Sequence, residues 1–314
     1  MPEPPALSFV FATDAYETIE PVVRALRAQT VHSELEIVVV TTDPEPVRAH
    51  VGLLDDFAAV RVVEIASLVP LSSARAAGVR AATAPIVYVG ETHVFPEPGW
   101  AKALIEAHAG PWGVVVPGFG NANPVGALSW AAFLADYGAW LSVLPACELT
   151  SAPTYNTAYK RAALLELEPL ETMLTTGEGL IARLRASGQR FVFEPAARVS
   201  HANVARPRHW VVERYLGGLL VAHSRMQDWS WGRRLAYAAA SPLIPIVCLA
   251  RVRHGVAAVH RTGALSFGTY PALVAGAFIS AAGELVGYLG GSVERGERRM
   301  TEYEIHKLRY LSSR

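Results

Sequence analysis

The most constraining feature of the sequence is an alternation, over residues 7–120, between short apolar strand patterns and segments with helical spacing. Runs rich in valine, isoleucine and aromatic residues occur at residues 7–13, 35–42, 60–66, 85–90 and 112–118. Amphipathic or small-residue segments, such as residues 18–30 and 72–84, separate them. Continuous apolar strands joined by helices are typical of a sheet that is buried on both faces. The pattern therefore predicts an α/β fold with a mostly parallel central sheet covered by helices.

The middle of the chain is less regular. Its patterns predict helices at residues 129–144 and 177–188, a strand entering a helix at 154–167, and two short strands around a Glu-Pro turn at 189–201. The pattern then changes to long apolar or amphipathic helices. We therefore expect one α/β domain over residues 1–205 and a helical, apolar C-terminal region over residues 206–314.

Two apolar runs, residues 235–250 and 270–289, hold most of the apolar excess of a chain that is 51% apolar and 18% charged. As a helix the first run is about 24 Å long, which is shorter than a hydrocarbon core of about 30 Å. Pro242 and Pro245 would bend it, and Glu284 interrupts the second run. A simple pair of membrane spans is therefore not the favoured interpretation.

Arginines lie on both sides of the first run, so the positive-inside rule gives no orientation; they are Arg233, Arg234, Arg251, Arg253 and Arg261. Trp229 and Trp231 suit the headgroup layer of a membrane. We expect monotopic or re-entrant association with a membrane surface. A two-helix span, and a buried soluble subdomain or oligomer interface, remain the alternatives.

Charge and cysteine content exclude several classes. The chain has 28 basic and 28 acidic residues, so no excess of positive charge indicates nucleic-acid binding. Cys147 and Cys248 are far apart and fit no metal spacing, and we expect both to be buried apolar residues without a disulfide. The first residues lack a basic segment and a long apolar segment, which predicts no cleavable signal peptide.

Polar residues follow three of the predicted strands, and they are Thr13 and Asp14, then Thr41, Thr42 and Asp43, then Glu91 and His93. The carboxyl ends of parallel strands meet at one edge of a sheet, where ligands bind. The first strand is not followed by Gly-x-Gly-x-x-Gly, and no Gly-Lys-Ser/Thr loop occurs, which disfavours dinucleotide-binding and P-loop proteins. The turn after the first strand is acidic and free of glycine, which also disfavours a nucleotidyltransferase.

Five segments, taken in order, resemble the inverting glycosyltransferases of family 2; they are residues 8–30, 35–44, 72–100, 154–167 and 177–203. The resemblance implies a GT-A fold and transfer of a sugar from a nucleoside-diphosphate donor. The implied acceptor is a polysaccharide, a lipid or a polyprenyl-linked glycan. Many members carry apolar C-terminal helices, so the resemblance also implies a location at the cytoplasmic face of the cell membrane. It further implies a part in cell-envelope polysaccharide biosynthesis and a possible homo-oligomer.

The family's Asp-x-Asp motif holds a divalent cation on the donor diphosphate, and here that position is Glu91-Thr92-His93. Glutamate oxygen and imidazole nitrogen both ligate Mn²⁺ or Mg²⁺, and imidazole suits Mn²⁺ better. The resemblance thus makes Glu91 and His93 a variant metal site with one carboxylate fewer than usual. The alternative is that both are solvated residues of a turn between strand and helix.

Five further positions match donor-binding positions of the family. Thr41 and Thr42 replace the paired aspartates that contact base and ribose, and Asp43 could substitute for them or act as a turn or cap residue. Arg75, on the first turns of a helix, is placed to favour a diphosphate; a surface ion pair is the alternative. His201 matches a histidine that reaches phosphate or metal, or it is a structural histidine.

Inverting transfer also requires a carboxylate that removes the proton of the acceptor hydroxyl. By resemblance this base is Glu178, the only carboxylate between Glu171 and Glu194. Its alternative role is a charge that stabilises a helix N-terminus. Tyr155 and Asn156 are expected on the acceptor side.

A second hypothesis follows from the loss of the usual aspartates. A relative that keeps the fold but not the activity would be a binding or scaffold module in an envelope-assembly complex. Binding of a nucleotide sugar distinguishes the two hypotheses.

Overall fold

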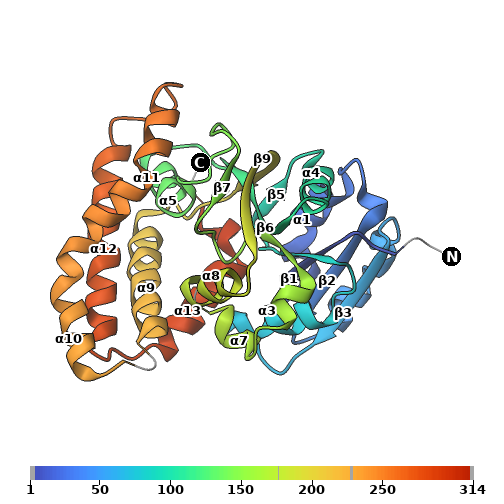
Figure 1. Ribbon diagram of the computed structural model, residues 1–314, viewed down its shortest axis with the longest axis horizontal. Coiled ribbons are helices and arrows are strands. Elements are labelled where there is room, and N and C mark those ends of the chain that lie inside the picture. Colours follow the sequence, from blue (N-terminus) through green and yellow to red (C-terminus); the bar gives the residue numbers. More distant parts are fainter. Residues whose placement is uncertain (1–3, 176, 227–228, 312–314) are drawn as a thin grey trace. The chain divides into compact units, whose positions relative to one another are not determined.

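The computed structural model of the chain (Figure 1) describes residues 4–175, 177–226 and 229–311, without the side chains of Val51, Leu53, Gly177 and Glu178. Contacts between residues divide the chain into two compact units. The first comprises Met1–Gly120 and Ser142–Ser200, and the second comprises Asn121–Leu141 and His201–Arg314. The division into domains at residues 1–205 and 206–314 stays a prediction.

One half of the central sheet consists of four parallel strands. Strand β1 (Leu7–Ala12) pairs with β2 (Leu35–Thr41) on one side and with β4 (Ile86–Val89) on the other, and β2 pairs with β3 (Ala59–Glu64). Every residue of β1, β2 and β4 is buried, because helices cover both faces of this half of the sheet. The apolar runs read from the sequence are therefore the strands of an α/β fold, as expected.

The other half of the sheet is mixed. Strand β8 (Thr157–Lys160) lies antiparallel between β4 and β6 (Trp112–Asn121). Strands β9 (Arg190–His201) and β5 (Val94–Pro96) follow, and β7 (Cys147–Leu149) pairs antiparallel with β9. In the described part of the chain the order is β3-β2-β1-β4-β8-β6-β9-β5. The α/β fold with a central sheet covered by helices is as expected, and its parallel part consists of β3, β2, β1 and β4.

Two local predictions were wrong. Residues 189–201 form one strand, β9, rather than two, since Pro195 fits an extended backbone and the amide of Ala196 donates to the Glu194 carboxylate at 3.0 Å. Cys147 is exposed, because it begins the short strand β7, two of whose three residues are exposed. Cys248 is half-buried.

Helices of the first unit pack on the parallel strands. Helix α1 (Tyr16–Arg27) buries Ile19, Val22, Val23 and Leu26, the apolar stripe expected from its spacing. Helix α3 (Leu71–Ala81) lies so close to β1 that a Cβ at Gly78 would be 2.3 Å from the Val10 side chain. The other helices are α4 (Trp100–His108), α2 (Glu45–Arg48), α6 (Arg161–Leu165), α7 (Leu170–Met173) and α8 (Gly177–Ala186).

The second unit is helical, and its described helices are α5 (Ala127–Tyr137), α9 (Pro207–Arg225), α10 (Trp231–Ala240), α11 (Ile244–His260), α12 (Thr269–Tyr288) and α13 (Glu294–Ile305). Helices α9 and α12 run side by side (Figure 1) and contact each other along their length. Glycines allow this close approach, since a Cβ at Gly218 would be 2.0 Å from the Ser280 carbonyl oxygen, and one at Gly283 would be 2.1 Å from that of Tyr215.

Helices α10 to α12 expose an unusual amount of apolar surface. Two stretches, Trp231–His260 and Thr269–Tyr288, are long and apolar enough to cross a membrane, yet only 22% and 33% of their apolar windows are buried. Glu284 does not contradict membrane contact, because it is buried, pairs with Arg225 at 2.9 Å and accepts a hydrogen bond from Tyr288. The exposed side chains include Trp231, Leu235, Leu243, Ile246, Val247, Phe267 and Phe278.

Candidate functional site

The segment Glu91-Thr92-His93 lies between β4 and β5, directly after the carboxyl end of β4. The backbone is tightly held where it leaves the strand, since a Cβ at Gly90 would be 2.3 Å from the Phe9 ring, and the Gly90 amide donates to Val10 of β1. Glu91 is 6% exposed and His93 is 0% exposed. These side chains are therefore not the solvated turn residues of the alternative interpretation.

The Glu91 carboxylate is the centre of a buried polar group. One oxygen accepts a 2.6 Å hydrogen bond from the Asn156 side-chain amide and lies 3.3 Å from Nε2 of His93. The other oxygen lies 3.4 Å from the Arg75 guanidinium. A buried carboxylate requires such partners, because its desolvation is otherwise too costly. The Tyr88 hydroxyl is also buried, and its pKa is raised by burial and by the nearby Glu91 carboxylate.

Arg75 is placed by α3 and by an aromatic ring. Its guanidinium stacks 3.5 Å from the centroid of the Tyr155 ring, and the Tyr155 hydroxyl donates to the Leu174 carbonyl. Arg75 is 4% exposed, so it is not the surface ion-pair residue of the alternative interpretation. Asn156 has a left-handed backbone conformation, with φ of 55°, and its side-chain amide donates to Glu91. This hydrogen bond orients the Glu91 carboxylate.

His201 is the last residue of β9, and its tautomer follows from its neighbours. The Asn203 amide nitrogen donates to Asn121 Oδ1 and to the His201 carbonyl, so Asn203 Oδ1 faces His201 Nδ1 at 2.9 Å and accepts its proton. In the neutral form of this ring, Nε2 is then the nitrogen that carries the lone pair, as a metal-binding histidine requires. Asn203 was missed from the sequence; its signal is an asparagine two residues after a candidate ligand.

Glu91, His93 and His201 together have the composition of a metal site. One ligand atom from each lies within 4.8 Å of the others, and all three residues are buried. Ligands at about 2.1 Å from one octahedral ion lie about 3 Å apart when adjacent and about 4 Å apart when opposite. The group therefore fits a divalent cation after small side-chain adjustments. One carboxylate and two imidazoles suit Mn²⁺ better than Mg²⁺.

The residues after β1 and β2 are engaged in local turns. The Thr13 hydroxyl donates to the Ala15 carbonyl at 2.8 Å, and the Thr41 hydroxyl donates to the Asp43 carbonyl at 3.1 Å. Asp14 is exposed and accepts a hydrogen bond from Thr18. The exposed Asp43 carboxylate accepts from the Glu45 amide at 3.2 Å, the contact of a turn residue before Pro44. Their part in nucleotide binding stays a prediction.

The proposed catalytic base falls outside the described side chains. Glu178 is the second residue of α8, and the structure describes its place in the helix but not its side chain.

No family model and no curated protein matches the sequence. Among solved structures, the mannosyltransferase PcManGT from Pyrobaculum calidifontis, in complex with GDP-Man and Mn²⁺, matches with a TM-score of 0.53 at 18% sequence identity. The match covers 98% of this chain and 86% of that one. This chain has the GT-A fold. S. aureus TarS 1-349 in complex with UDP matches at a TM-score of 0.48 and 15% identity, over 90% of this chain and 91% of that chain.

Proposed function

We propose that this chain is a glycosyltransferase that uses a nucleoside-diphosphate sugar as donor and a divalent cation, preferably Mn²⁺, as cofactor. The observation that carries the proposal is the buried Glu91 carboxylate after β4, together with His93, His201 and Arg75. A structural neighbour of the same fold binds GDP-Man and Mn²⁺, which supports this donor class.

Each residue has a defined role. Glu91, His93 and His201 hold the cation, which offsets the negative charge of the donor diphosphate when bound. Arg75 adds a guanidinium beside them, and guanidinium groups bind phosphate oxygens in pairs. Tyr155 and Asn156 orient Arg75 and Glu91 by the contacts described above. Thr13, Asp14, Thr41 and Asp43, after β1 and β2, contact the nucleoside.

The proposed reaction is a single displacement with inversion, as in family 2. An acceptor hydroxyl oxygen attacks the anomeric carbon of the donor sugar, and its proton passes to the Glu178 carboxylate. The bond between the anomeric carbon and the diphosphate oxygen breaks, and its electron pair leaves with the nucleoside diphosphate. The acceptor is a polysaccharide, a lipid or a polyprenyl-linked glycan.

Replacement of the base separates binding from chemistry. We expect Glu178→Gln to lower transfer by at least about a hundredfold and to leave donor affinity unchanged, because general-base catalysis contributes about 10²–10⁴-fold. The control is Glu106→Gln, an exposed carboxylate on α4, which should have full activity. Turnover and donor binding are measured by product release and by calorimetry. Full turnover in Glu178→Gln would remove this residue from the mechanism.

A second candidate function is a GT-A-like binding protein without transfer activity. The observation in its favour is that the Glu91 carboxylate already has protein partners in Arg75, Asn156 and His93. A donor that binds without Mn²⁺, and is never consumed with any acceptor, would favour this function.

We also propose that helices α10 to α12 associate with the cytoplasmic face of the membrane as a monotopic element. Their exposed apolar residues support this, and so does the charge of residues 229–283, which contain five arginines and no acidic residue. Such a segment is attracted to anionic headgroups while its apolar side chains enter the acyl region.

A further inference from the structure

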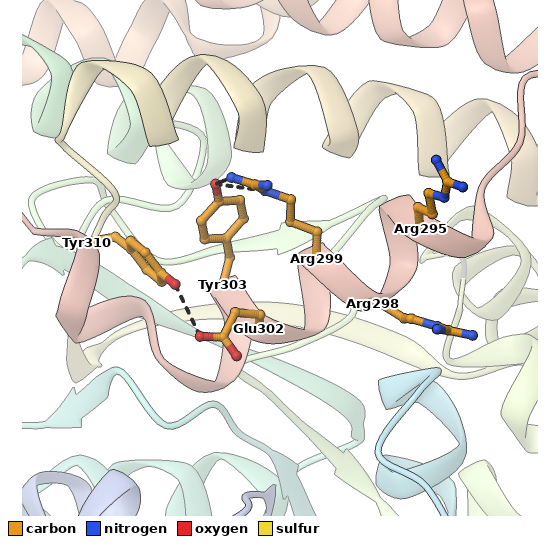
Figure 2. A pocket seen from close by; sticks show the side chains of 6 residues that line it. All are labelled: Arg295, Arg298, Arg299, Glu302, Tyr303 and Tyr310. Atoms are coloured by element: carbon orange, nitrogen blue, oxygen red, sulfur yellow. Dashed lines mark hydrogen bonds between the residues drawn. The ribbon is translucent and has the colours of Figure 1, made fainter.

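The second unit has a pocket of about 550 Å³ beside α13 that none of the roles above uses. Figure 2 shows five of the lining side chains on successive turns of α13 and Tyr310 beside Tyr303 and Glu302, at the end of the short helical segment Lys307–Tyr310. Three guanidinium groups and one carboxylate leave two positive charges in the lining, which consists of Arg295, Arg298, Arg299, Glu302, Tyr303 and Tyr310.

The arginines of this pocket differ in their partners. Arg299 donates from Nε and Nη2 to the Tyr303 hydroxyl, at 3.3 and 3.2 Å. Within the described parts of the chain, Arg295 and Arg298 make no side-chain hydrogen bond or ion pair, and both are exposed. The Glu302 carboxylate is already engaged by the Tyr310 hydroxyl at 3.1 Å and by Arg309 at 3.7 Å. Two guanidinium groups therefore have their donors available for a ligand.

The surrounding residues keep the pocket positive. Tyr303 accepts from Arg299, so it donates its own proton to Nδ1 of His209 at 3.1 Å, which requires a neutral imidazole. The pKa of His209 is lowered by partial burial and by the charges of three arginines, Arg299, Arg208 and Arg206. The histidine thus stays an acceptor near neutral pH, and the tyrosine holds Arg299 in place.

We propose that this pocket binds a phosphate group, with Arg295 and Arg298 as its direct ligands. A guanidinium presents paired donors that match two phosphate oxygens, and a phosphate monoester carries about −1.5 to −2 charges near pH 7. That charge matches the excess of the lining. The half-buried ring of Tyr310 forms the apolar wall against which the rest of the ligand packs, since Tyr303 behind it is only 1% exposed.

An anionic lipid is the favoured source of this phosphate. Helix α13 begins at Glu294, soon after the apolar helix α12 ends at Tyr288. At that end, Trp229 stacks on Tyr288 and a Cβ at Gly290 would be 4.0 Å from the Trp231 ring. Tryptophans of this kind lie at the headgroup level of a membrane, where lipid phosphates are found. This choice of source rests on the proposed membrane association, whereas phosphate binding itself does not.

The test compares two double variants of the full chain in the presence of EDTA. Arg295→Gln/Arg298→Gln removes the two ligands, and Lys102→Gln/Arg183→Gln removes two exposed charges from α4 and α8 of the first unit. Calorimetry measures binding of inorganic pyrophosphate, and sedimentation measures binding to phosphatidylcholine vesicles with and without phosphatidic acid. Pyrophosphate that binds elsewhere, at Arg75 for example, binds both variants equally and therefore does not contribute to the difference between them.

We expect the Arg295→Gln/Arg298→Gln variant to bind pyrophosphate and phosphatidic acid vesicles at least tenfold more weakly than the wild type, with the same melting temperature. The control variant should bind both probes like the wild type. Weaker pyrophosphate binding with unchanged vesicle binding assigns a soluble phosphate ester instead of a lipid. Unchanged binding of both probes, in a variant that melts like the wild type, overturns the proposal. The single variant Arg298→Gln provides the same comparison if the double variant does not fold.

Discussion

At the scale of single residues, two buried carboxylates show what distinguishes the candidate site. The Glu36 carboxylate accepts hydrogen bonds of 2.5–2.8 Å from three residues of the fold, Ser8, Arg61 and Thr83. Glu91 instead lies beside two groups that can themselves bind parts of a nucleotide-sugar complex. The His93 imidazole can ligate a cation, and the Arg75 guanidinium can bind phosphate oxygens. A carboxylate satisfied like Glu36 stabilises the fold, whereas one placed like Glu91 can take a cation.

Glu36 makes stability depend on pH in a defined direction. Burial alone would raise its pKa, but the hydrogen bonds from Ser8, Thr83 and Arg61 outweigh burial and lower the pKa below its ordinary value of 4.5. Its contribution is therefore fully present above pH 4.5 and is lost as the pH falls through the lower folded pKa. We expect Glu36→Gln to be less stable than the wild type at pH 7 and to lose less stability on acidification, measured by urea unfolding from pH 7 to 3. A parallel loss in both proteins would contradict this role.

The strand ends, together with the resemblance to family 2, predicted Glu91 and His93 as candidate residues. Arg75 was predicted from the same resemblance and from its place on the first turns of a helix. Their partners were not predictable in the same way. Asn156 reaches Glu91 because β8 lies beside β4, although the two strands are about 70 residues apart in sequence. Asn203 contacts His201 from two residues away in the sequence, whereas Asn121, which orients Asn203, is 82 residues distant, and no local pattern encodes that second contact.

At the scale of elements, small residues decide how closely helices pack. In the α9–α12 pair, glycine occupies two of the closest contacts, Gly218 and Gly283, and a Cβ at either would lie about 2 Å from a carbonyl oxygen of the other helix. The sequence pattern predicted both helices but not this pairing, because a glycine in an apolar segment does not indicate which other helix packs against it. The charged segment that forms α13 was likewise not predicted as a helix.

The glycine contact gives a matched pair of substitutions. We expect Gly283→Ala to destabilise the second unit by about 1–3 kcal/mol, because its methyl group would force α9 and α12 apart. Gly232→Ala in α10 meets nothing within 4 Å and should be neutral or stabilising by up to about 1 kcal/mol. Thermal unfolding monitored by circular dichroism measures both. Equal stability of the two variants would contradict the close packing.

At the scale of the whole molecule, a GT-A fold is joined to helices with exposed apolar residues. Ile246 and Val247 on α11 are 65% and 56% exposed. We expect Ile246→Ser/Val247→Ser to lower binding to anionic vesicles several-fold in flotation experiments without changing the melting temperature, because exposed apolar side chains contribute to insertion and not to the core. Val125→Ser/Val143→Ser is a matched control at exposed sites in loops. Vesicle binding that is unchanged in both double variants would contradict the proposal that α11 contacts the membrane.

The proposed cation site is best examined by calorimetry of the purified protein with GDP-mannose and UDP-N-acetylglucosamine, each with and without Mn²⁺. We expect at least one nucleotide sugar to bind at least tenfold more tightly with Mn²⁺, and His93→Ala to abolish this gain. Folded protein that binds neither donor, or a donor affinity that neither Mn²⁺ nor His93→Ala changes, would contradict the claim that Glu91, His93 and His201 hold the cation of a sugar-nucleotide site.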